Sequence, residues 1–242
     1  MSYNYHGLQY ELSVTEVNRF IKDYDSLFDG KLSNFYNYSR VVSLAEFSLL
    51  TQKLKLQNQR YVGVISGSMN EPELKLINAE QISLLNFTED AKYDLDMSWK
   101  LQSSHNFSLT ICNQVFEHIF NQHIALENLI HHTKKDGHIY ISIPTVNCIH
   151  GEPYFYSAGF HPRFLERLAL EHNLETLNIG FWGSHKYLIN SVSGQWLTNH
   201  QLKRGVHRLR DLRYPISIFQ DGRIRSKNNR YITDCWGLFK KK

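Results

Sequence analysis

Features that are scarce in this sequence exclude several classes of protein. No apolar run approaches about 18 residues, the length that spans a bilayer, so no transmembrane helix is predicted. The first residues lack the basic start and apolar stretch of a signal peptide, so a cytoplasmic protein is expected. Prolines number only five while aromatic residues make up 13% of the chain, which disfavours disorder. The 242 residues are enough for one large globular domain with an ordinary core.

Cysteine is also scarce, and its placement argues against covalent or metal crosslinks. The three cysteines, Cys112, Cys148 and Cys235, cannot all pair within one chain. Cys112 and Cys235 lie in apolar, strand-like runs, where a free thiol behaves as a small hydrophobe. We therefore expect reduced cysteines without a disulfide framework. The sequence contains neither CxxC nor HExxH, and its thirteen histidines are scattered, so no metal site is predicted.

The charge is unevenly distributed along the chain. Residues 201–230 carry nine Lys and Arg against two Asp, whereas residues 1–200 are acidic overall. A basic segment on an acidic body favours an anionic partner that is reached from one side. A solvated basic surface with counter-ions is the alternative interpretation.

The region before residue 58 has the pattern of two helices. Ser13 to Glu16 and Ser43 to Glu46 both match the capping box, in which a hydroxyl and a carboxylate satisfy the first backbone amides of a helix. Apolar residues follow each box at helical spacing. Helices are therefore predicted to begin at both boxes.

After this region strands and helices alternate, which is the pattern of a mostly parallel sheet covered on both faces. In such sheets ligands bind beyond the carboxyl ends of the strands, where the strand order reverses. The predicted strands are residues 61–65, 82–87, 107–112, 138–144, 177–181 and 231–239. The predicted helices are one that has Pro72 in its first turn, then residues 115–131 and 162–172.

One segment carries a specific resemblance to a known family. It consists of the segment Phe107–Ile119, in which Glu117 and His118 follow an apolar strand, then a helix, and then Lys135–Pro144. Its order and spacing resemble the second half of class I S-adenosylmethionine-dependent methyltransferases of the small-molecule or sugar type. The likeness extends over roughly residues 58–190 and 231–240.

The resemblance implies an α/β, three-layer sandwich with a mostly parallel seven-stranded sheet whose last strand is antiparallel. Residues 1–58 would form an N-terminal helical cover, and residues 59–242 the methyltransferase-like domain. Residues 191–230 would be a basic insertion before the last strand.

The cofactor that the resemblance implies is S-adenosylmethionine, although the glycine motif is degenerate. The family has a glycine run after the first strand, where the backbone approaches the cofactor closely; this chain has Ser66, Gly67 and Ser68. Asn86 stands where the family keeps an acidic residue for the ribose hydroxyls. The residues assigned to the cofactor by this resemblance are Ser66, Gly67, Ser68, Asn86, Phe87, Asp96, Met97, Asn113 and Gln114.

Three histidines are candidates for catalysis. The methyl group on the sulfonium is already activated, so the protein mainly aligns the reacting atoms, and an oxygen nucleophile also benefits from a general base. His118 follows the strand that faces the methyl group in this fold, and an unperturbed imidazole titrates near neutrality. His161 and His185 lie in loop-like positions after strands. For all three, helix capping, packing or surface exposure is the competing interpretation.

The acceptor is expected to be small and anionic, such as a sugar phosphate, a nucleotide sugar or a glycan precursor. Aromatic side chains in the loop after residue 144 can stack on a ring, and arginine forks suit phosphate or carboxylate groups. The candidate acceptor residues are Glu117, Tyr154, Tyr156, Arg163, Arg204 and Arg208.

The leading hypothesis is therefore an O-methyltransferase, and two alternatives stay open. The missing glycines also suit a methyltransferase-like binding or scaffold protein without catalysis. The arginine-rich segment also suits an RNA-directed methyltransferase or an RNA-binding protein, since it provides sequence-independent affinity for phosphates.

Overall fold

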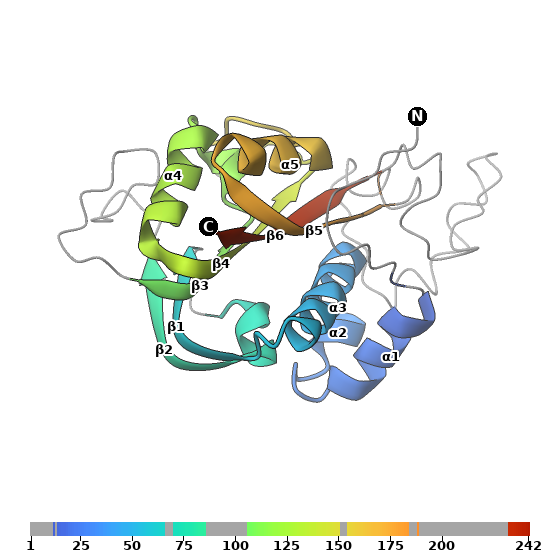
Figure 1. The fold of residues 1–242 in the computed structure, drawn as a ribbon. Helices are drawn as coiled ribbons and strands as arrows, with labels where there is room; N and C mark the ends of the chain where they lie inside the picture. The colour runs from blue at the N-terminus through green and yellow to red at the C-terminus, as the bar shows by residue number, and fades with distance from the viewer. Residues whose placement is uncertain are drawn as a thin grey trace.

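The computed structural model describes most of the chain (Figure 1). The described residues are 14–65, 70–85, 106–150, 154–183 and 232–242, together with Leu12 and Leu188. Within them, no helix has both the length and the apolar character needed to cross a membrane.

A six-stranded sheet forms the centre of the described structure, in the order β2-β1-β3-β4-β6-β5. Strands β1 to β4 pair in parallel, whereas β6 is antiparallel to both of its neighbours, which confirms the predicted mostly parallel sheet with an antiparallel last strand. Seven strands were expected, and residues 86–105, between β2 and β3, lie outside the described residues. The strands are β1 (Asn58–Ile65), β2 (Asn78–Leu85), β3 (Phe107–Asn113), β4 (Thr133–Pro144), β5 (Leu174–Trp182) and β6 (Asp234–Lys241).

Helices cover the two faces of this sheet, so the three-layer α/β prediction is confirmed. Figure 1 shows α4 and α5 on one side and α1 to α3 on the other. The ring of Phe47 in α3 packs on that of Tyr140 in β4 at 4.8 Å between centroids, and both belong to one continuous core. The helices are α1 (Val14–Tyr24), α2 (Lys31–Asn34), α3 (Tyr38–Lys53), α4 (Gln122–His132) and α5 (Pro162–Glu171), with 3-10 turns η1 (Pro72–Leu76) and η2 (Phe116–His118).

The predicted start of helix α3 at the second capping box, Ser43 to Glu46, is wrong. The helix begins earlier, at Tyr38, because the side chain of Asn37 accepts a hydrogen bond from the backbone amide of Arg40 at 2.8 Å. Ser43 and Glu46 are instead buried inside the helix, and Ser43 donates to the Arg40 carbonyl at 2.9 Å. The Ser43 hydroxyl and the Glu46 carboxylate therefore make contacts in the interior and do not cap a helix. The first box includes Ser13, which lies outside the described residues.

The helix predicted over residues 115–131 begins later than expected. Phe116–His118 form a separate 3-10 turn, and Ile119 is extended, so α4 starts only after Asn121, whose side chain caps Ile124 N at 3.2 Å. The helical apolar spacing was misleading because Phe116 and Ile119 are buried at the end of the sheet rather than on a helix face. Glu117 and His118 consequently lie in a tight turn directly after β3.

Two further boundaries differ from those expected. The helix after Pro72 is only a 3-10 turn, because β2 already begins at Asn78. Strand β4 begins at Thr133 and includes the expected turn at 135–137, where Asp136 has a φ of 60°. The burial of Cys112 and Cys235 was predicted correctly, and all three cysteines are free thiols.

Candidate functional site

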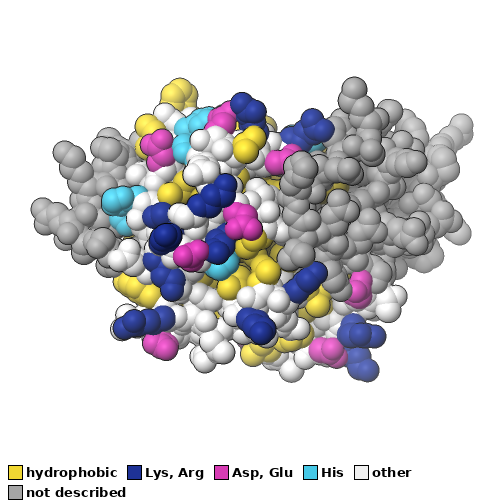
Figure 2. Space-filling view, viewed as in Figure 1, with side chains coloured by type: hydrophobic (Ala, Val, Ile, Leu, Met, Phe, Trp, Pro, Cys, Tyr) yellow, Lys and Arg dark blue, Asp and Glu magenta, His cyan; other side chains and the backbone are white. Residues whose placement is uncertain are grey.

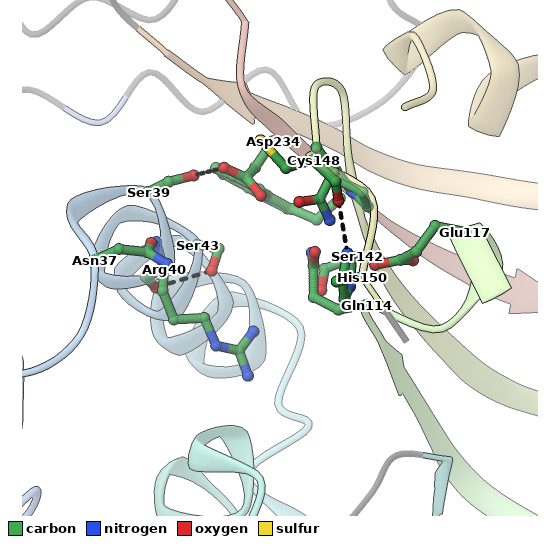
Figure 3. A pocket seen from close by; sticks show the side chains of 13 residues that line it. Asn37, Ser39, Arg40, Ser43, Gln114, Glu117, Ser142, Cys148, His150 and Asp234 are labelled. Atoms are coloured by element: carbon green, nitrogen blue, oxygen red, sulfur yellow. Dashed lines mark hydrogen bonds between the residues drawn. The ribbon is translucent and has the colours of Figure 1, made fainter. Parts of the chain in front are cut away.

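A cavity of about 400 Å³ lies at the carboxyl edge of the sheet, beneath the N-terminal turn of α3. The ends of β3 and β4 form its floor with the beginning of β6, which runs in the opposite direction and pairs Asp234 with Pro144. The strand order reverses next to this cavity, between β1 and β3, since the chain adds β2 on one side of β1 and β3 on the other. Figure 3 shows Ser39 and Arg40 of α3 facing Gln114, Glu117, His150 and Asp234 across this space.

Arg40 joins α3 to the η1 turn through an ionic network. Its Nη2 atom lies 2.9 Å from Glu71 Oε2 and 2.7 Å from Glu73 Oε2. Asn113, the last residue of β3, donates to the same two carboxylates at 2.8 and 3.0 Å and accepts from Ser142 at 2.9 Å. Asn113 therefore links the two glutamates to Ser142 of β4.

Part of this network keeps unsatisfied polar atoms. Arg40 Nη1 and Glu73 Oε1 are buried without a hydrogen-bond partner among the described residues. Burial raises the pKa of Glu73 to about 7, although the Arg40 guanidinium opposes the shift. Buried polar atoms are normally paired, so unpaired ones at a cavity are candidates for contacts with a ligand.

Glu117 is the most unusual group of the cavity wall. Its side chain is 0% exposed, and neither carboxylate oxygen has a hydrogen-bond partner on another described residue. Burial raises the pKa of this carboxyl to about 7. Its backbone carbonyl accepts from the amides of Tyr156 and Ser157 at 2.8 and 3.2 Å, so the loop after β4 is fastened to the η2 turn.

His118 lies beside Glu117 and has a defined tautomer. Its Nδ1 lies 2.5 Å from the carbonyl oxygen of Tyr154, and because a carbonyl can only accept, Nδ1 carries the proton. The Nε2 atom is 4.0 Å from Glu117 Oε1. Burial lowers the pKa of His118, with a further contribution from His150, which favours the neutral ring. The Nε2 atom of that ring then presents its lone pair.

His150 completes a cluster that the sequence did not indicate. It lines the cavity, its ring centroid is 4.8 Å from that of His118, and its Nδ1 donates to the Cys148 carbonyl at 2.8 Å. The sequence carries no local signal for this contact, because His150 belongs to the loop after the next strand.

Asp234 was also missed by sequence reasoning. It accepts a hydrogen bond from Ser39 of α3, which ties the helix to the start of β6 across the cavity (Figure 3). Burial raises the pKa of Asp234 to about 6.

The remaining described candidates lie in various places. Gln114 lines the cavity with a φ of 53°, and its backbone N–H donates to the Ser142 carbonyl at 2.8 Å. His161 and Arg163 do not line the cavity: the His161 ring caps helix α5 by accepting from the Arg163 amide at 3.2 Å. The exposed ring of Tyr156 packs against Phe120, with 5.6 Å between centroids.

The other candidates lie outside the described residues, and so does the basic segment 201–230. They are Ser66, Gly67, Ser68, Asn86, Phe87, Asp96, Met97, His185, Arg204 and Arg208. On the described part of the face in Figure 2, Lys and Arg are interspersed with Asp and Glu rather than gathered in one patch.

Comparison with known proteins gives a likeness in structure alone. No protein-family model matches the sequence, and no curated protein matches it. Among solved structures, a candidate sarcosine dimethylglycine methyltransferase from Galdieria sulphuraria aligns with a TM-score of 0.50 and 13% identity, over 93% of this chain and 98% of that one.

Two other solved structures align slightly less well. The N-methyltransferase NodS from Bradyrhizobium japonicum WM9, in complex with S-adenosyl-l-homocysteine, gives a TM-score of 0.49 at 10% identity, over 90% of this chain and 97% of that one. The [4+2]-cyclase SpnF gives 0.48 at 10% identity, over 93% and 92%. At these identities the likeness concerns the fold alone, which is the α/β fold of the methyltransferase with the TM-score of 0.50.

Proposed function

We propose that this protein is an S-adenosylmethionine-dependent methyltransferase that methylates a hydroxyl group of a small, anionic acceptor. The observation that carries the proposal is the position of the cavity. It lies over the carboxyl ends of β3 and β4, beside the reversal of strand order, where open α/β sheets bind their ligands.

The described polar groups at this edge suit the charges of the cofactor. S-adenosylmethionine carries a carboxylate, an ammonium group and a sulfonium, and it supplies an activated methyl group when bound. Arg40 Nη1, which is buried and unpaired, matches a carboxylate, and the nearby Glu71 and Glu73 match the cationic groups. These residues would hold the methionine part, while Ser66 to Ser68 and Asn86 are proposed for the rest on the sequence resemblance.

The cavity also suits a small acceptor with hydroxyl groups. Its volume of about 400 Å³ is in the usual range for small-molecule sites, about 300–1,000 Å³. Glu117 and Asp234 provide carboxylate oxygens that accept hydrogen bonds from hydroxyls, and Gln114 provides an amide. The anionic character of the acceptor is proposed from the basic segment 201–230, as for a sugar phosphate or a nucleotide sugar.

Calorimetric titration with S-adenosylmethionine and S-adenosylhomocysteine tests the proposal. We expect both to bind. Gly67→Val should weaken the binding of both at least about tenfold, because the resemblance predicts that the cofactor contacts the backbone here and a side chain would occupy that space. Ala79→Val, near the amino end of β2, introduces the same side chain far from the carboxyl edge and should bind like the wild type. Absence of binding to the folded wild-type protein would refute the proposal.

A second measurement identifies the acceptor. Mass spectrometry of reactions with sugar phosphates, nucleotide sugars and their hydroxyl-free analogues should detect a mass increase of one methylene group only where a hydroxyl is present. Methylation of amines in place of hydroxyls would refute O-methylation while leaving the methyltransferase assignment intact.

A further inference from the structure

We propose that Glu117, His118 and His150 bind a divalent transition-metal ion of the zinc type in the wall of the cavity. Each of these residues offers one ligand atom, and the three atoms lie within 4.8 Å of one another. A tetrahedral zinc ion with bonds of about 2.0–2.1 Å to nitrogen and oxygen separates its ligand atoms by about 3.4 Å. The ligand atoms therefore have to approach one another by up to about 1.4 Å. Rotation of the exposed His150 side chain contributes to this, and Glu117 and His118, 4.0 Å apart, need about 0.6 Å more.

The two imidazoles are already oriented as metal-binding histidines are. Nδ1 of His118 donates to the Tyr154 carbonyl and Nδ1 of His150 donates to the Cys148 carbonyl. In metal sites the second ring nitrogen of a ligating histidine is commonly held in this way by a backbone carbonyl, which fixes the tautomer and leaves Nε2 to bind the metal. Both neutral rings therefore present a lone pair at Nε2.

Glu117 provides an independent reason for a cation at this place. A carboxylate that is 0% exposed and has no hydrogen-bond partner among the described residues is costly to bury. A metal ion would supply the missing positive charge. The backbone bonds from Tyr156 and Ser157 to the Glu117 carbonyl hold the turn and the β4 loop together, so the ligands from both segments stay adjacent.

The ligand set also indicates the kind of metal. Two imidazoles and one carboxylate suit zinc, iron and related ions, whereas magnesium prefers oxygen ligands alone. Three protein ligands leave a coordination position open, and Glu117 and His150 line the cavity. This part of the inference rests on the proposed function: the open position would take an oxygen of the acceptor. His118 would then be a metal ligand rather than the general base expected from the sequence.

Metal titration without any methyl donor tests this inference separately from the methyltransferase proposal. Metal-free, full-length protein without a histidine tag is titrated with Zn²⁺ by calorimetry and with Co²⁺ by visible absorption. We expect one equivalent to bind, and the absorption bands of bound Co²⁺ to appear. His150→Ala and Glu117→Gln should each weaken binding at least about tenfold, since each removes a ligand.

His161→Ala is the matched control, because His161 also accepts or donates through its ring but lies outside the cavity wall. It should bind Zn²⁺ like the wild type. Since His150 is exposed, its replacement should leave the fold and the circular dichroism spectrum unchanged. Wild-type protein that binds no Zn²⁺, or His150→Ala that binds it as tightly as the wild type, would overturn the inference. Retained binding of S-adenosylmethionine in that case would leave the proposed function standing.

Discussion

Two buried glutamates, one packed against β5 and one at the carboxyl edge of the sheet, illustrate different uses of a carboxylate. Glu46 lies in α3, is 1% exposed and accepts a hydrogen bond from Asn178 of β5 at 2.5 Å. Glu117 lies in the turn after β3, is 0% exposed and has no such partner among the described residues. The first is embedded in the α3–β5 interface, and the second faces the cavity at the carboxyl edge.

The residues packed around Glu46 leave room for its carboxylate. A Cβ atom added at Gly180 would lie 2.7 Å from Glu46 Oε2 and 2.1 Å from the Trp236 indole nitrogen, so only glycine leaves room for both groups. At the carboxyl edge the polar atoms instead remain unsatisfied next to open space. A buried carboxylate with a hydrogen-bond partner stabilises the fold, whereas one without a partner beside a cavity is a candidate for binding a ligand.

The largest expected effect on stability comes from removing the Arg40 guanidinium, which pairs with a third buried carboxylate, that of Glu73. Arg40→Met should lower the free energy of unfolding by about 3–5 kcal/mol, because Glu73 and Glu71 would be left without their cation. Urea unfolding followed by tryptophan fluorescence measures this change. In this variant Glu73 would be a buried carboxylate without its cation, as Glu117 is, and the difference between paired and unpaired carboxylates would disappear.

The control for this variant is Arg167→Met, which removes an exposed pair with Glu171 within α5 and should leave the unfolding midpoint unchanged. Adding Glu73→Gln to Arg40→Met should recover part of the loss, since it removes the unpaired charge. An Arg40→Met protein as stable as the wild type would show that the network contributes nothing to folding.

The next effect sharpens the comparison on the α3 side. Glu46→Ala should lower the free energy of unfolding by about 2–4 kcal/mol, because it leaves the buried Asn178 amide without its acceptor and opens a cavity. Thermal and urea unfolding both report on it. The affinity for S-adenosylmethionine, measured at a temperature at which the variant is folded, should not change. A lower affinity would place Glu46 within the functional site.

The smallest effect on stability is expected at the cavity. Glu117→Gln in metal-free protein should leave the free energy of unfolding within about 1 kcal/mol of the wild type, with a gain more expected than a loss, because an unpaired buried charge is removed. The same urea unfolding assay measures it. A loss as large as that of Glu46→Ala would mean that Glu117 has a structural partner, and would contradict the comparison.

The strands show how far the sequence alone could lead. Apolar runs placed β1 and β3 close to their observed bounds and located the end of β4, and Glu117 and His118 after β3 were named as candidate site residues. The start of α3 was misplaced because Ser43 and Glu46 match a capping box equally well when they serve interior contacts. Helical spacing around Phe116 likewise suggested a helix where burial at a sheet edge requires a turn.

By itself, the sequence determined the alternation of strands and helices and the presence of Glu117 and His118 after a buried strand, because these depend on local periodicity and composition. Only the tertiary structure brought His150, Asp234 and Arg40 to the same cavity. Such contacts join segments that are distant along the chain, and they are decided by strand order and by the path of loops, which leave no periodic signal in the sequence.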